Sequence, residues 1–419
     1  MPLLHLFGEA KINLTRKHPS IHKTINDHEP MNSKFRILFV PAIFFLILCS
    51  FSTDALAASH YAIIDAGSSG SRLFLYKTGS DVQGNLTARS IPLVKNKVSP
   101  GISTLVTQPS EVAAYIEPLL ILLDDTIKEL GIPQSDVNFS LIATAGMRVE
   151  SPLLQQRVYE AVQTKAKAML PGMNIQYTVT LQGRYEGAFQ WLCVNYLKGN
   201  LSLQAETVGV LETGGGSFQL TYETGSKASN TIDLFSLKYG STLYGLFSRS
   251  YTGLGGNYSR EDATDDPNSF PLGYPLASGA LGSGNYKQGL IGTRELISAR
   301  PTAIPLSAKL PPLEKFVGVG MFEGVAKDLV LGDRISANRV DQAASVIASI
   351  PWATQLAESP NNPFLFSKVD SAQLVSGLIR TWFPPSRELA VAREIGGTEI
   401  SWTLGAVLFL ASDNELPVQ

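Results

Sequence analysis

Short apolar runs alternate with polar turns along most of the chain, and their spacing predicts alternating strands and helices. Tyr61 to Asp65 reads as a strand that enters a Gly-Ser turn and leaves it through Leu73 to Tyr76, which predicts a β-hairpin. A long apolar-periodic helix that Ser110 can N-cap follows and is ended by Gly131. Further strands are predicted over 139–144, 176–181 and 208–212, and further helices over 152–170, 189–197, 327–330, 340–347, 372–381 and 402–410. This alternation is typical of α/β lobes.

A second hairpin repeats the design of the first. The strand 208–212 enters a turn of three glycines and leaves through residues 218–222. Both hairpins read as strand, acid, any residue, Gly, small polar turn and a strand that ends in Tyr, with Asp65 and Glu212 as the acids. A repeat of this kind indicates two related lobes, each of which contributes one turn to a single cleft.

Residues 251–293 are rich in Gly, Asn, Pro and Ser, which predicts a surface insertion. Its acidic residues lack the Gly and the distal Glu of a calcium loop, so we interpret it as solvated loop. These acids are Glu261, Asp262, Asp265 and Asp266.

The first 57 residues read as a signal peptide region. Lys34 and Arg36 precede the apolar run 37–51, and an Ala-Leu-Ala cleavage site follows at 55–57, which is the bacterial-type pattern. Met31 directly precedes the charged part, which favours a start there, with residues 1–30 upstream of the translated sequence. The run is short for a membrane span and contains Pro, so we expect export to the periplasm or beyond without a stable membrane anchor.

Composition narrows the classes of function. The 419 residues are 44% hydrophobic and 17% charged, enough to bury a large core in two or three domains or lobes. The net charge of −2 and the absence of a basic stripe argue against nucleic-acid binding. No protein partner is evident in the sequence.

Without residues 1–57, the only His is His60 and the only Cys is Cys193. A His-ligated zinc site, a Ser-His-Asp triad and a Cys-His dyad are therefore excluded. Catalysis must use carboxylates, hydroxyls, backbone amides or Arg. Cys193 lies in an apolar segment and reads as a buried structural thiol.

The two turns fit phosphate chemistry. Successive backbone amides of a Gly-Ser turn can bind a tetrahedral anion, and Asp65 and Glu212 can hold a divalent cation, Mg²⁺ or Ca²⁺, between phosphate oxygens. A P-loop is absent, and Gly282-Ser283-Gly284 lies in the predicted insertion rather than between a strand and a helix.

Two further residues are candidates for this chemistry. Arg148 directly follows a predicted strand and can reach phosphate oxygens as a bidentate donor, with a surface Arg at a helix start as the alternative. Glu186, in Gly183-Arg-Tyr-Glu-Gly187 at a strand-to-helix junction, is the best candidate base for an attacking water.

Five segments in this order resemble the nucleoside triphosphate diphosphohydrolases, the apyrases. They are Asp65-Ala-Gly-Ser-Ser-Gly-Ser-Arg72, Ala143-Thr-Ala-Gly-Met-Arg148, Glu186-Gly-Ala-Phe-Gln-Trp191 with Val194-Asn-Tyr196, Glu212-Thr-Gly-Gly-Gly-Ser-Phe-Gln219 and Trp402-Thr-Leu-Gly405. The resemblance implies a fold of two RNase-H-like α/β lobes of the actin, Hsp70 and sugar kinase superfamily, with the active site in the cleft between them. We expect lobe I over 58–184 plus 406–419 and lobe II over 185–405. It also implies cation-dependent hydrolysis of nucleoside tri- and diphosphates to the monophosphate.

The resemblance assigns a role to each motif residue. Glu186 looks like the general base, while Ser217 and Gln219 orient the attacking water. Asp65 and Glu212, with Thr144 nearby, position the metal through waters. Trp402 packs beside that site, with Glu399 close by. The phosphate-binding residues implied are Ser68, Ser69, Gly70, Ser71, Arg72, Arg148, Gly214, Gly215 and Gly216.

The chain departs from the family pattern at several positions. Glu212 and Glu399 replace Asp, which leaves the metal preference open. Ala372 and Gln373 fall where a Tyr against the nucleobase is common, with Phe364, Phe366 and Trp382 as substitutes among which the sequence does not choose.

Two alternatives stay open at this stage. The second turn also resembles that of exopolyphosphatase-like phosphatases of the same superfamily, although 144–148 and 402–405 argue against that family. A catalytically silent nucleotide-binding protein is the other, although Glu186, Ser217 and Gln219 are all present.

Overall fold

The structure is a computed structural model that describes residues 59–201, 205–225, 231–257, 266–304, 308–362 and 364–418. The predicted signal peptide therefore lies outside the described residues. In the described part of the chain, no helix combines the length and the apolar character that a membrane span needs.

The first sheet has six strands in the order β3-β2-β1-β5-β6, with β4 beside β2. The central strand β1 pairs antiparallel with β2 and parallel with β5, so the predicted hairpin sits at the middle of the sheet. The strands are β1 (His60–Gly67), β2 (Gly70–Ser80), β3 (Leu86–Ile91), β4 (Lys97–Val98), β5 (Val137–Ala143) and β6 (Asn174–Thr180).

The second sheet has seven strands in the order β12-β13-β11-β7-β8-β10-β9. Its hairpin β7–β8 is antiparallel, and β11 pairs parallel with β7. The strands are β7 (Gly209–Thr213), β8 (Ser217–Glu223), β9 (Leu234–Tyr239), β10 (Thr242–Thr252), β11 (Phe316–Gly320), β12 (Arg334–Ile335) and β13 (Leu389–Val391); a separate pair is formed by β14 (Glu394–Ile395) and β15 (Thr398–Glu399).

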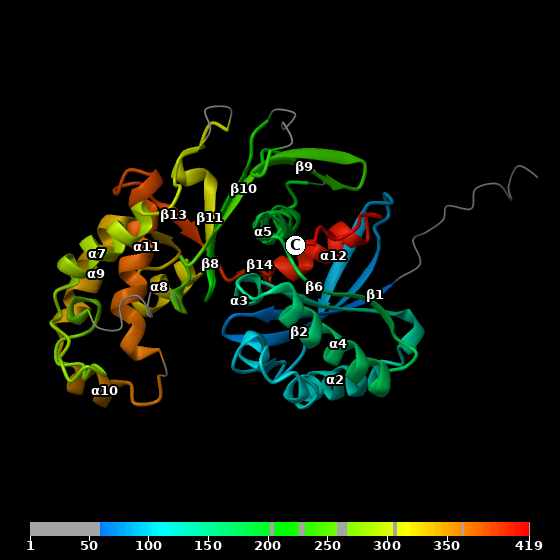
Figure 1. The fold of residues 1–419 in the computed structure, drawn as a ribbon. Helices are drawn as coiled ribbons and strands as arrows, with labels where there is room; N and C mark the ends of the chain where they lie inside the picture. Colours follow the sequence, from blue (N-terminus) through cyan, green and yellow to red (C-terminus); the bar gives the residue numbers. More distant parts are fainter. Residues whose placement is uncertain are drawn as a thin grey trace, which may run out of the picture. The chain divides into compact units, whose positions relative to one another are not determined.

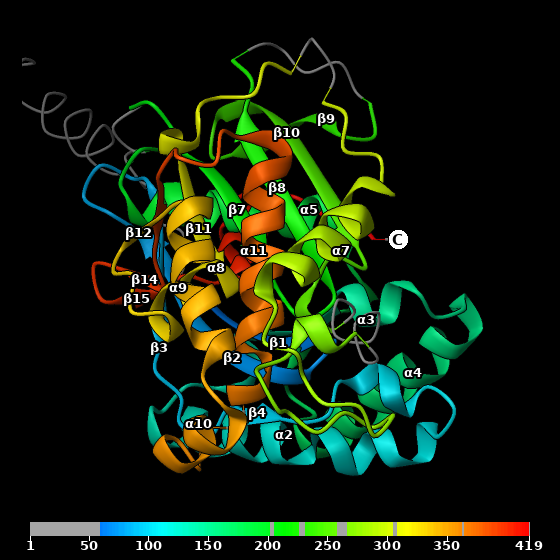
Figure 2. The same cartoon turned by 90° about the vertical axis from the view of Figure 1, so that its left-hand side faces the viewer.

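Helices lie outside each sheet and between the two sheets (Figure 1). The first sheet packs against α2 (Val112–Glu129) and α4 (Pro152–Met169). The second packs against α7 (Tyr286–Ser298), α8 (Met321–Asp328), α9 (Ala337–Ser349) and α11 (Lys368–Trp382). Figure 2 shows α9 and α11 in front of its strands. Between the sheets lie α5 (Gly183–Leu197) and α12 (Trp402–Leu410). The described residues also form the short helices α3 (Ala145–Arg148) and α10 (Trp352–Glu358).

The alternation of side chains along β1 explains this layering. Ala62 and Ile64 belong to the cluster with α2 and α4, whereas Tyr61 and Ile63 belong to the central cluster with α5 and α12. The central cluster also takes residues from the second sheet, such as Val210. Because β1 is apolar at nearly every position, both of its faces can be covered by helices.

Two glycines let α5 approach its neighbours closely. A Cβ on Gly187 would lie 2.4 Å from Thr221 Oγ1 on β8, and a Cβ on Gly405 of α12 would lie 1.9 Å from the carbonyl oxygen of Phe189. Both helices therefore depend on these glycines for their spacing. This packing fixes α5, which carries Glu186, against the second sheet and against α12.

Three local predictions need correction. Ser110 lies inside a short 3-10 turn, Pro109–Glu111, and does not cap α2 through its side chain. The helix placed at 327–330 is the end of α8, which begins earlier at Met321. The insertion is not purely solvated, because residues such as Phe270 and Tyr286 are buried; of its acids only Asp266 is described, and it accepts a hydrogen bond from the Asn268 backbone. Alternating polar and apolar residues within the stretch hid this anchoring.

Candidate active site

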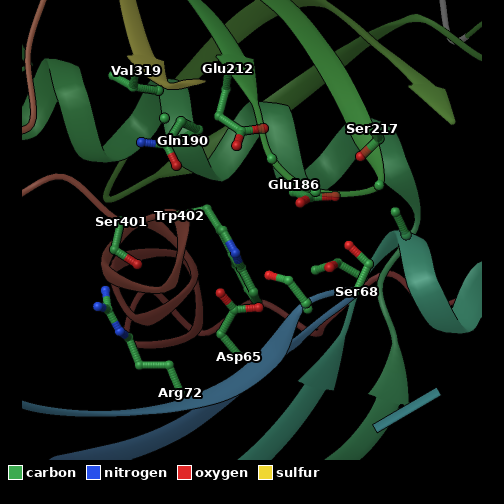
Figure 3. A pocket seen from close by; sticks show the side chains of 18 of the residues that line it. Asp65, Ser68, Arg72, Glu186, Gln190, Glu212, Ser217, Val319, Ser401 and Trp402 are labelled. Carbon is green, nitrogen blue, oxygen red and sulfur yellow. The ribbon is translucent and has the colours of Figure 1, made fainter. Parts of the chain in front are cut away.

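A cavity of about 330 Å³ lies where the two hairpin turns meet (Figure 3). It takes residues from both sheets, from α5 and from the start of α12. Its lining includes Asp65, Gly67, Ser68, Ser69, Gly70, Arg72, Phe74, Lys97, Thr144, Ala145, Glu186, Gln190, Glu212, Gly214, Gly215, Gly216, Ser217, Val319, Gly320, Glu399, Ile400, Ser401 and Trp402.

The first turn is tight and is supported from behind by two glycines. Gly67 and Gly70 are paired across the hairpin, which leaves Ser68 and Ser69 at its tip. A Cβ on Gly101 would lie 2.4 Å from the carbonyl oxygen of Ser68, and one on Gly146 would lie 3.0 Å from the Ser68 Cα. The turn is therefore held in place by segments that approach it more closely than any other residue type permits.

The second turn is braced by the chain that follows β10. The backbone N–H groups of Gly256 and Asn257 donate to the carbonyls of Gly214 and Gly215 at 3.0 and 2.8 Å. A Cβ on Gly255 would lie 2.4 Å from the backbone of Gly215. These bonds satisfy the carbonyls of the turn from outside. The Gly214 N–H donates to the Ser217 carbonyl at 3.1 Å, which leaves the amides of Gly215 and Gly216 for the cavity.

The two turns contact each other directly. A Cβ on Gly215 would lie 2.7 Å from Ser68 Oγ, and one on Gly216 would lie 2.6 Å from the Cβ of Ala145. Glycine at these two positions therefore lets the turns close on one space. Two sets of backbone amides that face one cavity can grip neighbouring phosphate groups.

Asp65 and Glu212 are the acids at the ends of β1 and β7, and both face this cavity (Figure 3). Burial first, and repulsion from Glu186 second, raise the pKa of Asp65 to about 7. The same two causes, followed by repulsion from Asp65, raise the pKa of Glu212 well above its usual value. Asp65 Oδ1 and Glu212 Oε2 are buried without a hydrogen-bond partner. Hard oxygen donors that repel one another and lack partners fit a divalent cation.

Among the residues that the structure describes, no group of three or more His, Cys, Asp and Glu side chains is placed to ligate one metal ion directly. The Trp402 indole lies beside Asp65 and hydrogen bonds to it, which opposes the rise in the pKa of that carboxyl. Trp402 is the first residue of α12, whose start is capped by Ser401.

Glu186 pairs with Arg148. Nη2 of Arg148 donates to Glu186 Oε2, Nε donates to the carbonyl of Leu181 at 2.9 Å, and the two side chains are only 8% and 10% exposed. Arg148 is thus neither a surface residue nor, in this structure, part of the cavity lining. The pair fixes the direction of the Glu186 carboxylate and leaves Oε1 without a hydrogen bond to any described residue.

Ser217 lines the cavity, whereas Gln219 lies behind it. Gln219 Nε2 donates to Ser217 Oγ at 2.6 Å and to Ser250 Oγ at 3.2 Å, while its Oε1 is buried without a partner. Gln219 therefore orients the Ser217 hydroxyl rather than facing the cavity itself.

Most of the predicted site residues line the one cavity. Ser71, Arg148 and Gln219 do not. The Ser71 hydroxyl is fully buried and accepts from Tyr115 Oη at 3.1 Å. Glu399 is in the lining, but its carboxylate pairs with Arg72 at 3.0 Å. None of the three substitutes for the nucleobase aromatic reaches the cavity: Phe364, Phe366 and Trp382.

Sequence reasoning missed several lining residues. Lys97 enters because β4 pairs with β2 and sets it opposite Arg72. Gln190 enters because it lies one helical turn beyond Glu186 on α5. The spacing of four residues from Glu186 was visible in the sequence and could have identified Gln190. The pairing of β4 with β2, which brings in Lys97, has no signal in the sequence.

The family model and the curated relatives that match this sequence all describe nucleoside phosphatases. The profile of the GDA1/CD39 (nucleoside phosphatase) family matches residues 54–266. A nucleoside-diphosphatase of Caenorhabditis briggsae is 29% identical over 54% of this chain and 48% of its own length. A nucleoside-triphosphatase of Caenorhabditis elegans is 30% identical over 46% of this chain and 38% of its own length. The chain thus matches less than half the length of these two curated relatives.

Among solved structures, that of nucleoside triphosphate hydrolases from Neospora caninum superposes with a TM-score of 0.60. The superposition covers 85% of this chain and 93% of that one at 13% sequence identity. At this identity the likeness concerns the fold, and it confirms the predicted α/β class with two lobes around a cavity.

Proposed function

The chain belongs to the GDA1/CD39 (nucleoside phosphatase) family, and we propose that it hydrolyses nucleoside tri- and diphosphates to the monophosphate with Mg²⁺ or Ca²⁺ as cofactor. One observation carries the proposal: the two glycine-rich turns line the same cavity as Asp65, Glu186 and Glu212. Phosphoryl transfer depends mainly on positioning and on charge neutralisation. The lining supplies amides, cationic side chains and a base for these tasks without any His.

In this proposal the two turns bind the phosphates. The amides of the first turn and the hydroxyls of Ser68 and Ser69 contact one phosphate group. The turn Gly214 to Gly216 contacts its neighbour through the amides of Gly215 and Gly216, since the Gly214 amide is bonded within the turn. Arg72 adds positive charge from β2. Support comes from the direct contact between the turns, since two adjacent phosphates need anion sites that adjoin.

Asp65 and Glu212 would hold the divalent cation, in part through its water shell, with Thr144 beside them. When bound, the cation neutralises charge on the phosphate oxygens that an attacking water must approach. Trp402 keeps the Asp65 carboxylate in its direction through the indole hydrogen bond. The unpartnered oxygens of both acids support this assignment.

Glu186 is the proposed base. Its Oε1 accepts a proton from the water as the water oxygen bonds to the terminal phosphorus, and the bond from that phosphorus to the bridging oxygen breaks, with its electron pair leaving on the remaining nucleotide. Arg148 holds Oε2 through this step, and Ser217, oriented by Gln219, directs the water. No covalent phosphoenzyme is needed.

Release of phosphate from ATP, ADP, AMP and polyphosphate, with Mg²⁺, Ca²⁺ or EDTA, tests the proposal. We expect release from ATP and ADP, none from AMP, and loss of activity in EDTA and in Glu186→Gln. Release from polyphosphate alone would assign the chain to an exopolyphosphatase-like activity. Nucleotide binding without release would make it a silent binding protein.

We also propose that the chain is exported after cleavage behind Ala57. The basic residues, the apolar run and the small residues before position 58 support this. Mass spectrometry of the N-terminal peptide from the periplasmic or culture fraction checks it, with a peptide that begins at Ala58 as the expected result. A cytoplasmic protein that retains residues 34–57 would contradict it.

A further inference from the structure

Gln190 is a buried amide that faces the cavity. Its side chain is only 4% exposed, yet it belongs to the cavity lining and points into the cavity near Glu212 in Figure 3. No described residue accepts or donates a hydrogen bond to its amide group. Neither polar atom of the amide is among the fully enclosed atoms that lack a partner, so the amide is open to the cavity and its partner is expected there.

The neighbouring amide on the same helix behaves differently. Asn195 donates to the carbonyls of Trp191 and Val208, both at 3.0 Å, and accepts from the Val208 amide at 2.9 Å. Asn195 is therefore fully used in joining α5 to the chain before β7. Gln190 makes no such bond, which separates it from the structural amides of α5.

The charge of the cavity indicates what Gln190 contacts. Asp65, Glu186 and Glu212 repel one another, and only Glu186 has a cationic partner in direct contact. A hydrated divalent cation is the group that these carboxylates fit. The waters of such an ion are strong hydrogen-bond donors, and an amide oxygen is a suitable acceptor for them.

We propose that Gln190 is a positioning residue for the cation, its amide oxygen accepting a hydrogen bond from a metal-bound water. The inference rests on the proposed function, because it assumes that the ion binds between Asp65 and Glu212. Gln190 adds a neutral acceptor on the α5 side of the ion. One turn earlier on the same face, Glu186 acts on the attacking water, so one helix positions both the base and the ion.

The test is a titration of the chain with Mn²⁺ alone, with the free ion measured by electron paramagnetic resonance. Gln190→Met keeps the length of the side chain and removes the acceptor, and we expect the Kd to rise about 10-fold. Gln288→Met, the same change at an exposed position on α7, is the matched control and should leave the Kd unchanged. Gln190→Glu restores an acceptor and should recover the affinity.

Thermal unfolding in EDTA separates a positioning role from a structural one. We expect Gln190→Met to melt no lower than the unmodified chain, because the amide forms no hydrogen bond with any described residue and faces the cavity. A Kd within twofold of the unmodified chain in Gln190→Met, with affinity lost in Asp65→Asn, would overturn the role of Gln190 alone. A lowered melting temperature with no recovery of affinity in Gln190→Glu would overturn it as well. Unchanged affinity in Asp65→Asn would instead remove the cation site and the proposed function together.

Discussion

In both hairpins a strand that ends in an acid is followed by the turn, but the two turns differ in their residues. The first turn presents two serine hydroxyls, and the residue paired with Asp65 across its hairpin is Arg72. The second is a run of three glycines, and the residue paired with Glu212 is Gln219. Charge differs in the same way, since the two cationic residues of the lining, Arg72 and Lys97, both come from the first sheet.

Their supports differ as well. The first turn packs against Gly101, which precedes α2, and against Gly146 in α3. The second is held by backbone hydrogen bonds from the segment after β10. The same hairpin pattern therefore presents different groups to the cavity: charge and hydroxyls at the first turn, and backbone amides held in a fixed position at the second.

Neutralising Asp65 or Glu212 should have the largest effect on activity, and it tests whether the acids of the two hairpins contribute equally to cation binding. Asp65→Asn and Glu212→Gln each neutralise a proposed cation ligand, and we expect kcat/KM for ATP to fall about 10³-fold in both. In EDTA both variants should melt higher than the unmodified chain, because repulsion among buried carboxylates is relieved. Steady-state kinetics and calorimetry check this, with the exposed Glu160→Gln as control. A large loss in one variant only would mean that a single lobe holds the ion.

Displacing the segment 255–257, which supports the second turn, tests the contribution of that turn without changing the first. A Cβ at position 255 meets the backbone of Gly215 at 2.4 Å, so Gly255→Ala must move the second turn. We expect kcat to fall about 100-fold, as for a displacement near 1 Å. Gly292→Ala, where a Cβ meets nothing within 4 Å, is the control and should be fully active. Full activity in Gly255→Ala would show that the brace does not position the amides.

Arg148→Lys tests whether Arg148 positions the Glu186 carboxylate. Lys keeps the charge but not the fork that bonds Glu186 and Leu181 together. We expect about a 10-fold loss in kcat, equivalent to one hydrogen bond to a charged group. Unchanged kcat with a raised KM for ATP would assign Arg148 to phosphate binding alone, as the sequence predicted.

The pair between Arg72 and Glu399 should matter least. Both side chains are more than a third exposed, and exposed ion pairs contribute at most about 1 kcal/mol. Glu399→Gln should change kcat/KM less than about threefold, measured at low and at moderate ionic strength. A larger loss would place Glu399 among the groups that act on the cation.

The elements of the site were predictable where the signal is local. The two hairpins with Asp65 and Glu212 followed from alternation and turn composition. Apolar spacing predicted a helix over 189–197 only, whereas α5 begins at Gly183 and includes Glu186. The joining of Arg148 to Glu186 did not, because it depends on how α3 and α5 pack across 38 residues of chain. The brace at Gly255 and Asn257 was hidden in a stretch whose composition resembles solvated loop. The candidate side chains of the site were therefore easier to predict from the sequence than the backbone segments that position them.

The most direct test of the central claim is anomalous diffraction from crystals grown with Mn²⁺ and a non-hydrolysable ATP analogue. The claim is that both turns act on one unit of phosphates and cation. We predict one anomalous peak between the carboxylates of Asp65 and Glu212, with phosphate oxygens hydrogen bonded to amides of both turns. A peak elsewhere, or phosphates bound by one turn only, would contradict the account.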